Sequence, residues 1–192
     1  MEIAIVTGAS SGLGREYAKL LDQEGLDEIW LVARRRPQLE TLAGELTTKS
    51  RIYALDLTDR ASLLTLQQAL AACQVTVRYL IHAAGFGKMG PVAAVPAGVL
   101  ENMIDLNDRA AVSLVQAVLP YCHAGSHLVQ ICSCASLPAH SGTGCLRGDE
   151  SLSPTLQPGT GRGTGTAGYP RICRLSVLGE RYRIHRDGPP DR

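Results

Sequence analysis

Short apolar segments alternate with amphipathic segments along the first 138 residues of the chain. Runs rich in Ile, Val and Leu predict five strands, at residues 2–7, 28–33, 51–55, 77–83 and 126–132. The stretches between them repeat apolar positions every three or four residues, which predicts helices at about 12–24, 37–47, 59–73 and 98–121. The strand segments are almost continuously apolar, as is typical of strands covered on both faces.

The pattern divides the chain into a domain and a tail. Alternating strands and helices are typical of a parallel sheet whose right-handed crossovers place helices on both faces. We therefore expect residues 1–138 to form an α/β domain of the Rossmann type, a doubly wound parallel sheet with strand order 3-2-1-4-5. Residues 139–192 hold half of the 20 glycines and half of the 10 prolines, with eight arginines and no lysine. This change in composition predicts that the sheet is incomplete and that an irregular tail follows it.

Charge and cysteine usage narrow the class of protein. A net charge of +1 provides no concentrated basic field for nucleic acid or a membrane surface, and no apolar run is long enough to span a membrane. The amino terminus shows no export signal. The six cysteines lack the spacing of a zinc site, so we expect reduced thiols, no metal and a cytoplasmic location.

A glycine loop, Thr7–Gly14, follows the first predicted strand and opens the first predicted helix. Gly8 permits the tight turn, Gly12 permits close approach of a phosphate, and Gly14 permits helix–strand packing. Amide groups at the helix start then face an anion, aided by the helix dipole. We expect a dinucleotide to be bound here by Gly8, Ser10, Ser11, Gly12, Leu13 and Gly14. The alternative is a glycine-rich turn without a ligand.

Three arginines, Arg34, Arg35 and Arg36, follow the second predicted strand, where a carboxylate would select NAD. A guanidinium suits the 2′-phosphate of NADP through paired hydrogen bonds. We therefore predict that Arg34, assisted by Arg35, selects NADP(H) over NAD(H). The alternative is that these arginines are merely solvated, as we expect for Arg36.

In this order of motifs the chain resembles the short-chain dehydrogenase/reductase family. The further matching positions are Asp56-Leu57 after the third strand, Ala84-Gly85 after the fourth, Asn107 in the fourth helix and Ser133 at the end of the fifth strand. The resemblance implies that Asp56, Leu57, Ala84 and Gly85 contact the cofactor and that Asn107 and Ser133 are catalytic. It also implies hydride transfer between nicotinamide and a small carbonyl or alcohol substrate.

Each of these assignments has a plainer alternative. Asn107 is also compatible with a solvated polar residue, Ser133 with a hydrogen-bonded strand-end serine, and Ser136 competes with Ser133 for the catalytic role. His82 and Ala83 stand where the family has asparagines. We expect His82 to be a satisfied core histidine rather than a proton shuttle.

The family pattern stops after Ser133. Its tyrosine is expected thirteen residues later, at Leu146, and its lysine four residues beyond, at Glu150; the sequence has no lysine after Lys88. Without a neighbouring cation a phenol is a poor base at neutral pH. If the gene is read in the frame that starts one base into the codon of Ser141, synonymous codons permit a Tyr-x-x-x-Lys motif. This motif would lie at the family's distance from Ser133. We therefore predict a one-base insertion or deletion near codons 136–141.

The favoured interpretation is an NADP(H)-dependent oxidoreductase by family whose present chain lacks the Tyr–Lys pair and is inactive. The alternative is a non-catalytic NADP-binding or sensing protein. Nucleic-acid binding by the arginine-containing tail is disfavoured because its charge excess is small. The resemblance makes a homo-oligomer conceivable for intact relatives, but one of the usual interface helices is missing here, which argues against assembly of this chain.

Overall fold

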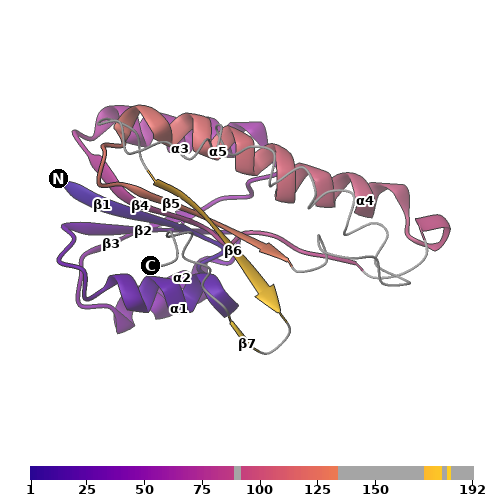
Figure 1. Cartoon of the computed structure of the whole chain (residues 1–192), viewed down its shortest axis with the longest axis horizontal. Coiled ribbons are helices and arrows are strands. Elements are labelled where there is room, and N and C mark those ends of the chain that lie inside the picture. The colour runs from indigo at the N-terminus through magenta and orange to yellow at the C-terminus, as the bar shows by residue number, and fades with distance from the viewer. Residues whose placement is uncertain (89–91, 134–170, 179–180, 183–192) are drawn as a thin grey trace, which may run out of the picture.

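The structure, a computed structural model, describes residues 1–88, 92–133, 171–178 and 181–182 (Figure 1). The strands among these residues form one sheet, in the order β3-β2-β1-β4-β5-β6-β7. They are β1 (Glu2–Thr7), β2 (Glu28–Ala33), β3 (Ser50–Ala54), β4 (Thr76–His82), β5 (His127–Ser133), β6 (Arg171–Leu178) and β7 (Arg181–Tyr182). Neighbouring strands are parallel from β3 to β6, and β7 is antiparallel to β6.

The order of the first five strands, 3-2-1-4-5, confirms the doubly wound Rossmann sheet predicted from the sequence. Each of these five strands lies within one residue of its predicted bounds. β1 is the middle of these five strands and is buried along almost its whole length, which explains its nearly continuous apolar sequence.

Helices cover both faces of this sheet. They are α1 (Gly12–Leu21), α2 (Arg36–Glu45), α3 (Arg60–Ala72), α4 (Ala97–Ile104) and α5 (Ala110–Val118). In Figure 1, α1 and α2 lie on one side of the sheet, and α3 and α5 lie on the other. A short 3-10 turn, η1 (Val92–Ala94), precedes α4.

The prediction of one continuous helix over 98–121 is wrong, because the helix is interrupted. Between α4 and α5 the chain forms a π-helical turn, η2 (Asp105–Arg109), and α5 ends in a 3-10 turn, η3 (Leu119–Tyr121). The N–H of Ala110 donates to the carbonyl of Asp105, five residues back, which inserts one extra residue into the helix. Apolar periodicity does not register such an insertion.

Two apolar clusters hold the layers together. Alternate residues of β1 point to opposite faces, so Ile3 and Ile5 join the cluster under α3 and α5, whereas Ala4 and Val6 join the one over α1 and α2. Trp30 of β2 is fully buried in the first cluster. Burial of each large aliphatic side chain stabilises the fold by roughly 1.5–3 kcal/mol.

Two strands, β6 and β7, lie within the stretch for which an irregular tail was expected. β6 pairs with β5 from His127↔Arg171 to Ser133↔Val177 and extends the sheet beyond the expected edge. The β6 sequence, RICRLSVL, is rich in apolar residues, a local signal that the glycine and proline content of the whole tail concealed. Residues 139–170, 179–180 and 183–192 lie outside the described residues.

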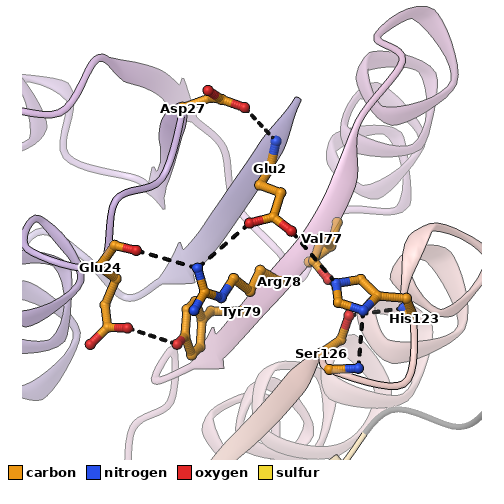
Figure 2. Close-up of polar contacts among 9 residues, drawn as sticks. Glu2, Glu24, Asp27, Val77, Arg78, Tyr79, His123 and Ser126 are labelled. Atoms are coloured by element: carbon orange, nitrogen blue, oxygen red, sulfur yellow. Dashed lines mark hydrogen bonds and ion pairs between the residues drawn. The ribbon is translucent and has the colours of Figure 1, made fainter.

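A polar network fixes the amino ends of the strands (Figure 2). Arg78 Nη1 lies 3.5 Å from a carboxylate oxygen of Glu2 and 3.3 Å from the carbonyl oxygen of Glu24, to which it donates. The buried Ser126 hydroxyl donates to the carbonyl of Val77 at 2.6 Å. These contacts anchor loops at the edge opposite the glycine loop. Over the described part of the chain, the helices are too short or too polar to traverse a bilayer.

Candidate functional site

The glycine loop connects β1 to α1 at the carboxyl edge of the sheet. Gly8 (φ +67°) and Gly12 (φ +55°) have left-handed backbone conformations, which favour glycine. A Cβ at Gly8 would stand 2.6 Å from the carbonyl oxygen of Ala83, and one at Gly14 would stand 2.5 Å from the carbonyl oxygen of Gly8. The space beside Gly12 is open. The loop therefore packs tightly against the end of β4 and leaves room for a ligand at Gly12.

The amide groups at the start of α1 remain available to an anion. Ser11 is the N-cap residue, but its side chain makes no capping hydrogen bond. Leu13 is half-buried in the first turn, whereas Ser11 and Gly12 are exposed. The first N–H groups of a helix have no partner within the helix, and together with the helix dipole they favour an anion, so the binding of a phosphate here stays a prediction.

The arginines after β2 reach the neighbouring loops. Arg35 Nη2 donates to the hydroxyls of Ser10 (3.0 Å) and Ser11 (2.7 Å) in the glycine loop. Arg34 Nη1 lies 3.7 Å from Asp56 Oδ2, and its side chain is 70% exposed. Of the two, Arg35, for which we predicted only an assisting role, is the one in contact with the glycine loop.

Asp56 orders the loop after β3, a feature that we call the Asp56 turn (residues 56–59). Its Oδ1 accepts hydrogen bonds from the N–H (3.0 Å) and the hydroxyl (2.7 Å) of Thr58. Partial burial raises the pKa of Asp56, but the Thr58 hydrogen bonds and the charge of Arg34 outweigh it and hold the pKa below its usual value. The side chain of Leu57 is buried in the core, so that residue offers a ligand mainly its backbone.

Asn107 lies in the π-helical turn and faces the segment after β4. Its Oδ1 accepts from the Phe86 N–H (3.1 Å), and its Nδ2 donates to the Phe86 carbonyl (2.9 Å). A Cβ at Gly85 would stand 3.1 Å from Asn107 Oδ1. Asn107 thus fixes the loop that begins at Ala84-Gly85, next to the glycine loop.

His82 ends β4, opposite Thr7 of β1. The Thr7 hydroxyl accepts from the Ala84 N–H (3.2 Å) and shares a hydrogen bond of 2.8 Å with His82 Nδ1. His82 is buried, and burial lowers its pKa to about 4. The expectation of a fully satisfied histidine is wrong in part, because Nε2 has no hydrogen-bond partner in the described portion of the chain.

Ser133 is the last residue of β5, whose parallel neighbour β4 ends at His82. Its backbone therefore lies at the same edge of the sheet as the glycine loop. Ser136, Leu146 and Glu150, the other positions of the predicted catalytic apparatus, lie outside the described residues. Within the described ranges, no group of three or more His, Cys, Asp or Glu residues could hold a metal ion.

Sequence reasoning missed several residues that shape this edge: Thr7, Thr58, Phe86 and Arg109. Thr7 was placed in the glycine loop but given no role of its own, and Thr58 and Phe86 act through a hydroxyl or a backbone group, which no motif marks. Arg109 carries a signal, because Asp105 precedes it by four residues on a predicted helix.

Comparison with known proteins identifies the family. The family model for short chain dehydrogenases matches residues 2–144. The chain therefore belongs to the short-chain dehydrogenase/reductase family, whose members are oxidoreductases that bind a nicotinamide dinucleotide.

Two curated relatives each match part of the chain. An uncharacterized oxidoreductase of Staphylococcus epidermidis is 28% identical over 134 residues, which cover 69% of this chain and 58% of the relative. A very-long-chain 3-oxoacyl-CoA reductase of Lodderomyces elongisporus is 36% identical over 125 residues, covering 61% of this chain and 35% of the relative. The chain thus spans 58% or less of the length of these curated relatives.

Solved structures show the same fold. Serine dehydrogenase from Escherichia coli is 25% identical with a TM-score of 0.69, over 81% of this chain and 73% of that one. A short-chain dehydrogenase from Sphingobium yanoikuyae in complex with NADPH is 26% identical with a TM-score of 0.71, over 81% of this chain and 63% of that one.

Proposed function

We propose that this chain binds NADP(H) in preference to NAD(H) at the carboxyl edge of β1, β2, β3 and β4. The observation that carries the proposal is the pair Arg34 and Arg35 at the end of β2, with Arg35 Nη2 within 3.0 Å of two hydroxyls of the glycine loop. A dianionic 2′-phosphate offers these guanidinium groups stronger acceptors than neutral hydroxyls do. Serine dehydrogenase complexed with NADP+, 26% identical, supports the choice of coenzyme.

The described residues divide the dinucleotide between them. The amide groups around Gly12 and Leu13 would bind the pyrophosphate, and the Asp56 turn would hold the adenine side. Ala84 and Gly85 would line the route toward nicotinamide, which supplies or accepts a hydride when bound. Asn107 keeps that route open by holding the Phe86 backbone.

Titration of the chain with NADPH and NADH tests the coenzyme preference. We expect Arg34→Ala and Arg35→Ala each to weaken NADPH binding by roughly tenfold while changing NADH binding little, because each removes a charge-assisted contact to the extra phosphate. Arg36→Ala is the matched control, since Arg36 lies on the exposed side of α2, where its Nη1 is 3.8 Å from Glu40 Oε1. Equal affinity of the unaltered chain for the two coenzymes would contradict the proposal.

The reaction that we propose for the lineage is hydride transfer between nicotinamide and a small carbonyl or alcohol, with Ser133 orienting the substrate oxygen. In this chain Leu146 and Glu150 occupy the positions of the family's tyrosine and lysine. Loss of positioned acid–base groups typically costs ~10² to 10⁴ in rate. We therefore propose that the chain as written binds coenzyme in the cytoplasm without turning over substrate at an enzymatic rate.

A shifted reading frame near codons 136–141 accounts for the missing pair. In support, the family match ends at residue 144, shortly after this point. Sequencing the gene tests the idea. We expect a one-base change whose correction encodes Tyr-x-x-x-Lys, and the corrected protein should reduce carbonyl compounds with NADPH. A stop codon in the alternative frame, or the absence of that tyrosine and lysine, would refute it.

A second candidate function is coenzyme binding without catalysis, as in a sensing protein. The observation that favours it is β6, which pairs with β5 along its whole length although the catalytic motif is missing. Sharp NADPH preference in a monodisperse chain, together with an unbroken native gene, would favour this function over the frameshift.

A further inference from the structure

Arg109 joins two turns at the carboxyl edge of the sheet that are distant in sequence. Its Nε donates to Asp105 Oδ1 at 2.6 Å, and its Nη2 donates to the backbone carbonyl of Thr58 at 2.5 Å. The side chain is only 27% exposed. One planar guanidinium therefore holds the π-helical turn and the Asp56 turn together.

Thr58 is the residue through which Arg109 reaches the adenine side. The N–H and hydroxyl of Thr58 both donate to Asp56 Oδ1, and the Asp59 N–H donates to the Asp56 carbonyl at 3.0 Å. The turn satisfies these donors internally, whereas the Thr58 carbonyl takes its hydrogen bond from outside, from Arg109. That contact therefore ties the turn to the π-helical turn, in addition to the burial of Leu57 and the Arg34–Asp56 pair.

The π-helical turn determines where Arg109 points. One extra residue between Asp105 and Ala110 rotates the helix surface by about 100° relative to a regular α-helix. The Asp105–Arg109 pair spans Asn107, whose side chain holds the Phe86 backbone. The same turn thus directs Asn107 toward the segment after β4 and Arg109 toward the Asp56 turn.

We infer that Arg109 is a positioning residue of the dinucleotide site, which fixes the Asp56 turn so that the adenine side of the coenzyme is bound. The inference rests on the proposed coenzyme binding. Arg109 acts through the Thr58 carbonyl, so its removal leaves the glycine loop and its contacts with Arg35 unchanged.

Binding measurements on the full chain test this role. We expect Arg109→Ala to weaken the binding of NADPH and of 2′,5′-ADP by the same factor, about tenfold, because both ligands contain the adenosine part of the coenzyme. Arg109→Lys, which keeps one donor toward Thr58, should recover affinity to within about threefold. Arg60→Ala is the matched control: Arg60 is exposed at the start of α3, next to the Asp56 turn, and should leave both affinities unchanged.

Hydrogen exchange separates positioning from general destabilisation and needs no coenzyme. In Arg109→Ala, the amides of Thr58 and Asp59 should exchange faster, while those of β1 should match the Arg60→Ala protein. If Arg109→Ala does not fold, Arg109→Gln carries the same expectations. Unchanged exchange and affinity, or equally faster exchange in β1, would overturn the inference. Failure of the unaltered chain to bind NADPH would instead refute the proposed function, whatever the exchange shows.

Discussion

His82, at the carboxyl edge of the sheet, shows how a single buried residue can make the stability of the fold depend on pH. It is enclosed at the end of β4, and the Thr7 hydroxyl occupies only one of its two ring nitrogens. Burial without a charged partner favours the neutral imidazole and lowers the pKa from 6.5 to about 4. An asparagine, which the family pattern has here, would carry no such titration.

Protonation of His82 makes the stability of the fold depend on pH. The unfolded chain binds a proton at His82 below about pH 6.5, whereas the folded chain does so only below about pH 4. The free energy of unfolding is therefore at its full value above about pH 6.5. It falls by roughly 3 kcal/mol in all as the pH drops toward 4. Urea unfolding at a series of pH values measures this loss.

Two histidine variants separate this effect from other titrations. His82→Asn should flatten the stability curve between about pH 6.5 and 4. His123→Asn, at an exposed position in the network of Figure 2, should keep the slope of the unaltered chain. A slope that survives in His82→Asn would show that another group is responsible.

Among the elements, the glycine loop depends most directly on its sequence. Gly8→Ala would place a methyl group 2.6 Å from the Ala83 carbonyl oxygen in a left-handed conformation. We expect a loss of at least about 2 kcal/mol in unfolding free energy, because a left-handed alanine alone costs roughly 1–2 kcal/mol, and a loss of NADPH binding. Gly44→Ala, in open space within α2, should be neutral or stabilise the chain by up to about 1 kcal/mol. Denaturant melts of the two variants compare them directly.

The elements also show how far sequence reasoning extends. The apolar runs located the first five strands to within one residue, because strands buried on both faces leave a continuous signal. The glycines of the loop follow from the motif, because a left-handed backbone favours glycine at Gly8 and Gly12, and at Gly14 there is no space for a Cβ. The π-helical turn and the contacts of Arg109 and Phe86 were not, because they depend on one inserted residue and on backbone carbonyls.

At the scale of the whole molecule, β6 covers the edge of β5 that an incomplete sheet would expose. Unpaired edge strands invite association between chains. We expect deletion of residues 171–192 to increase aggregation, measured by light scattering and size-exclusion chromatography. Deletion of residues 183–192 alone is the control and should leave the chain as monodisperse as before. Equal behaviour of the two deletions would show that β6 does not protect the sheet.

The contacts of Arg35 with Ser10 and Ser11 have a practical consequence for the bench. A guanidinium that donates to two neutral hydroxyls would form stronger hydrogen bonds with a tetrahedral oxyanion from the buffer. Buffer phosphate or ammonium sulfate would then compete with NADPH but not with NADH for that arginine. Comparisons of the two coenzymes therefore belong in buffers free of both salts, in which the discrimination is not masked.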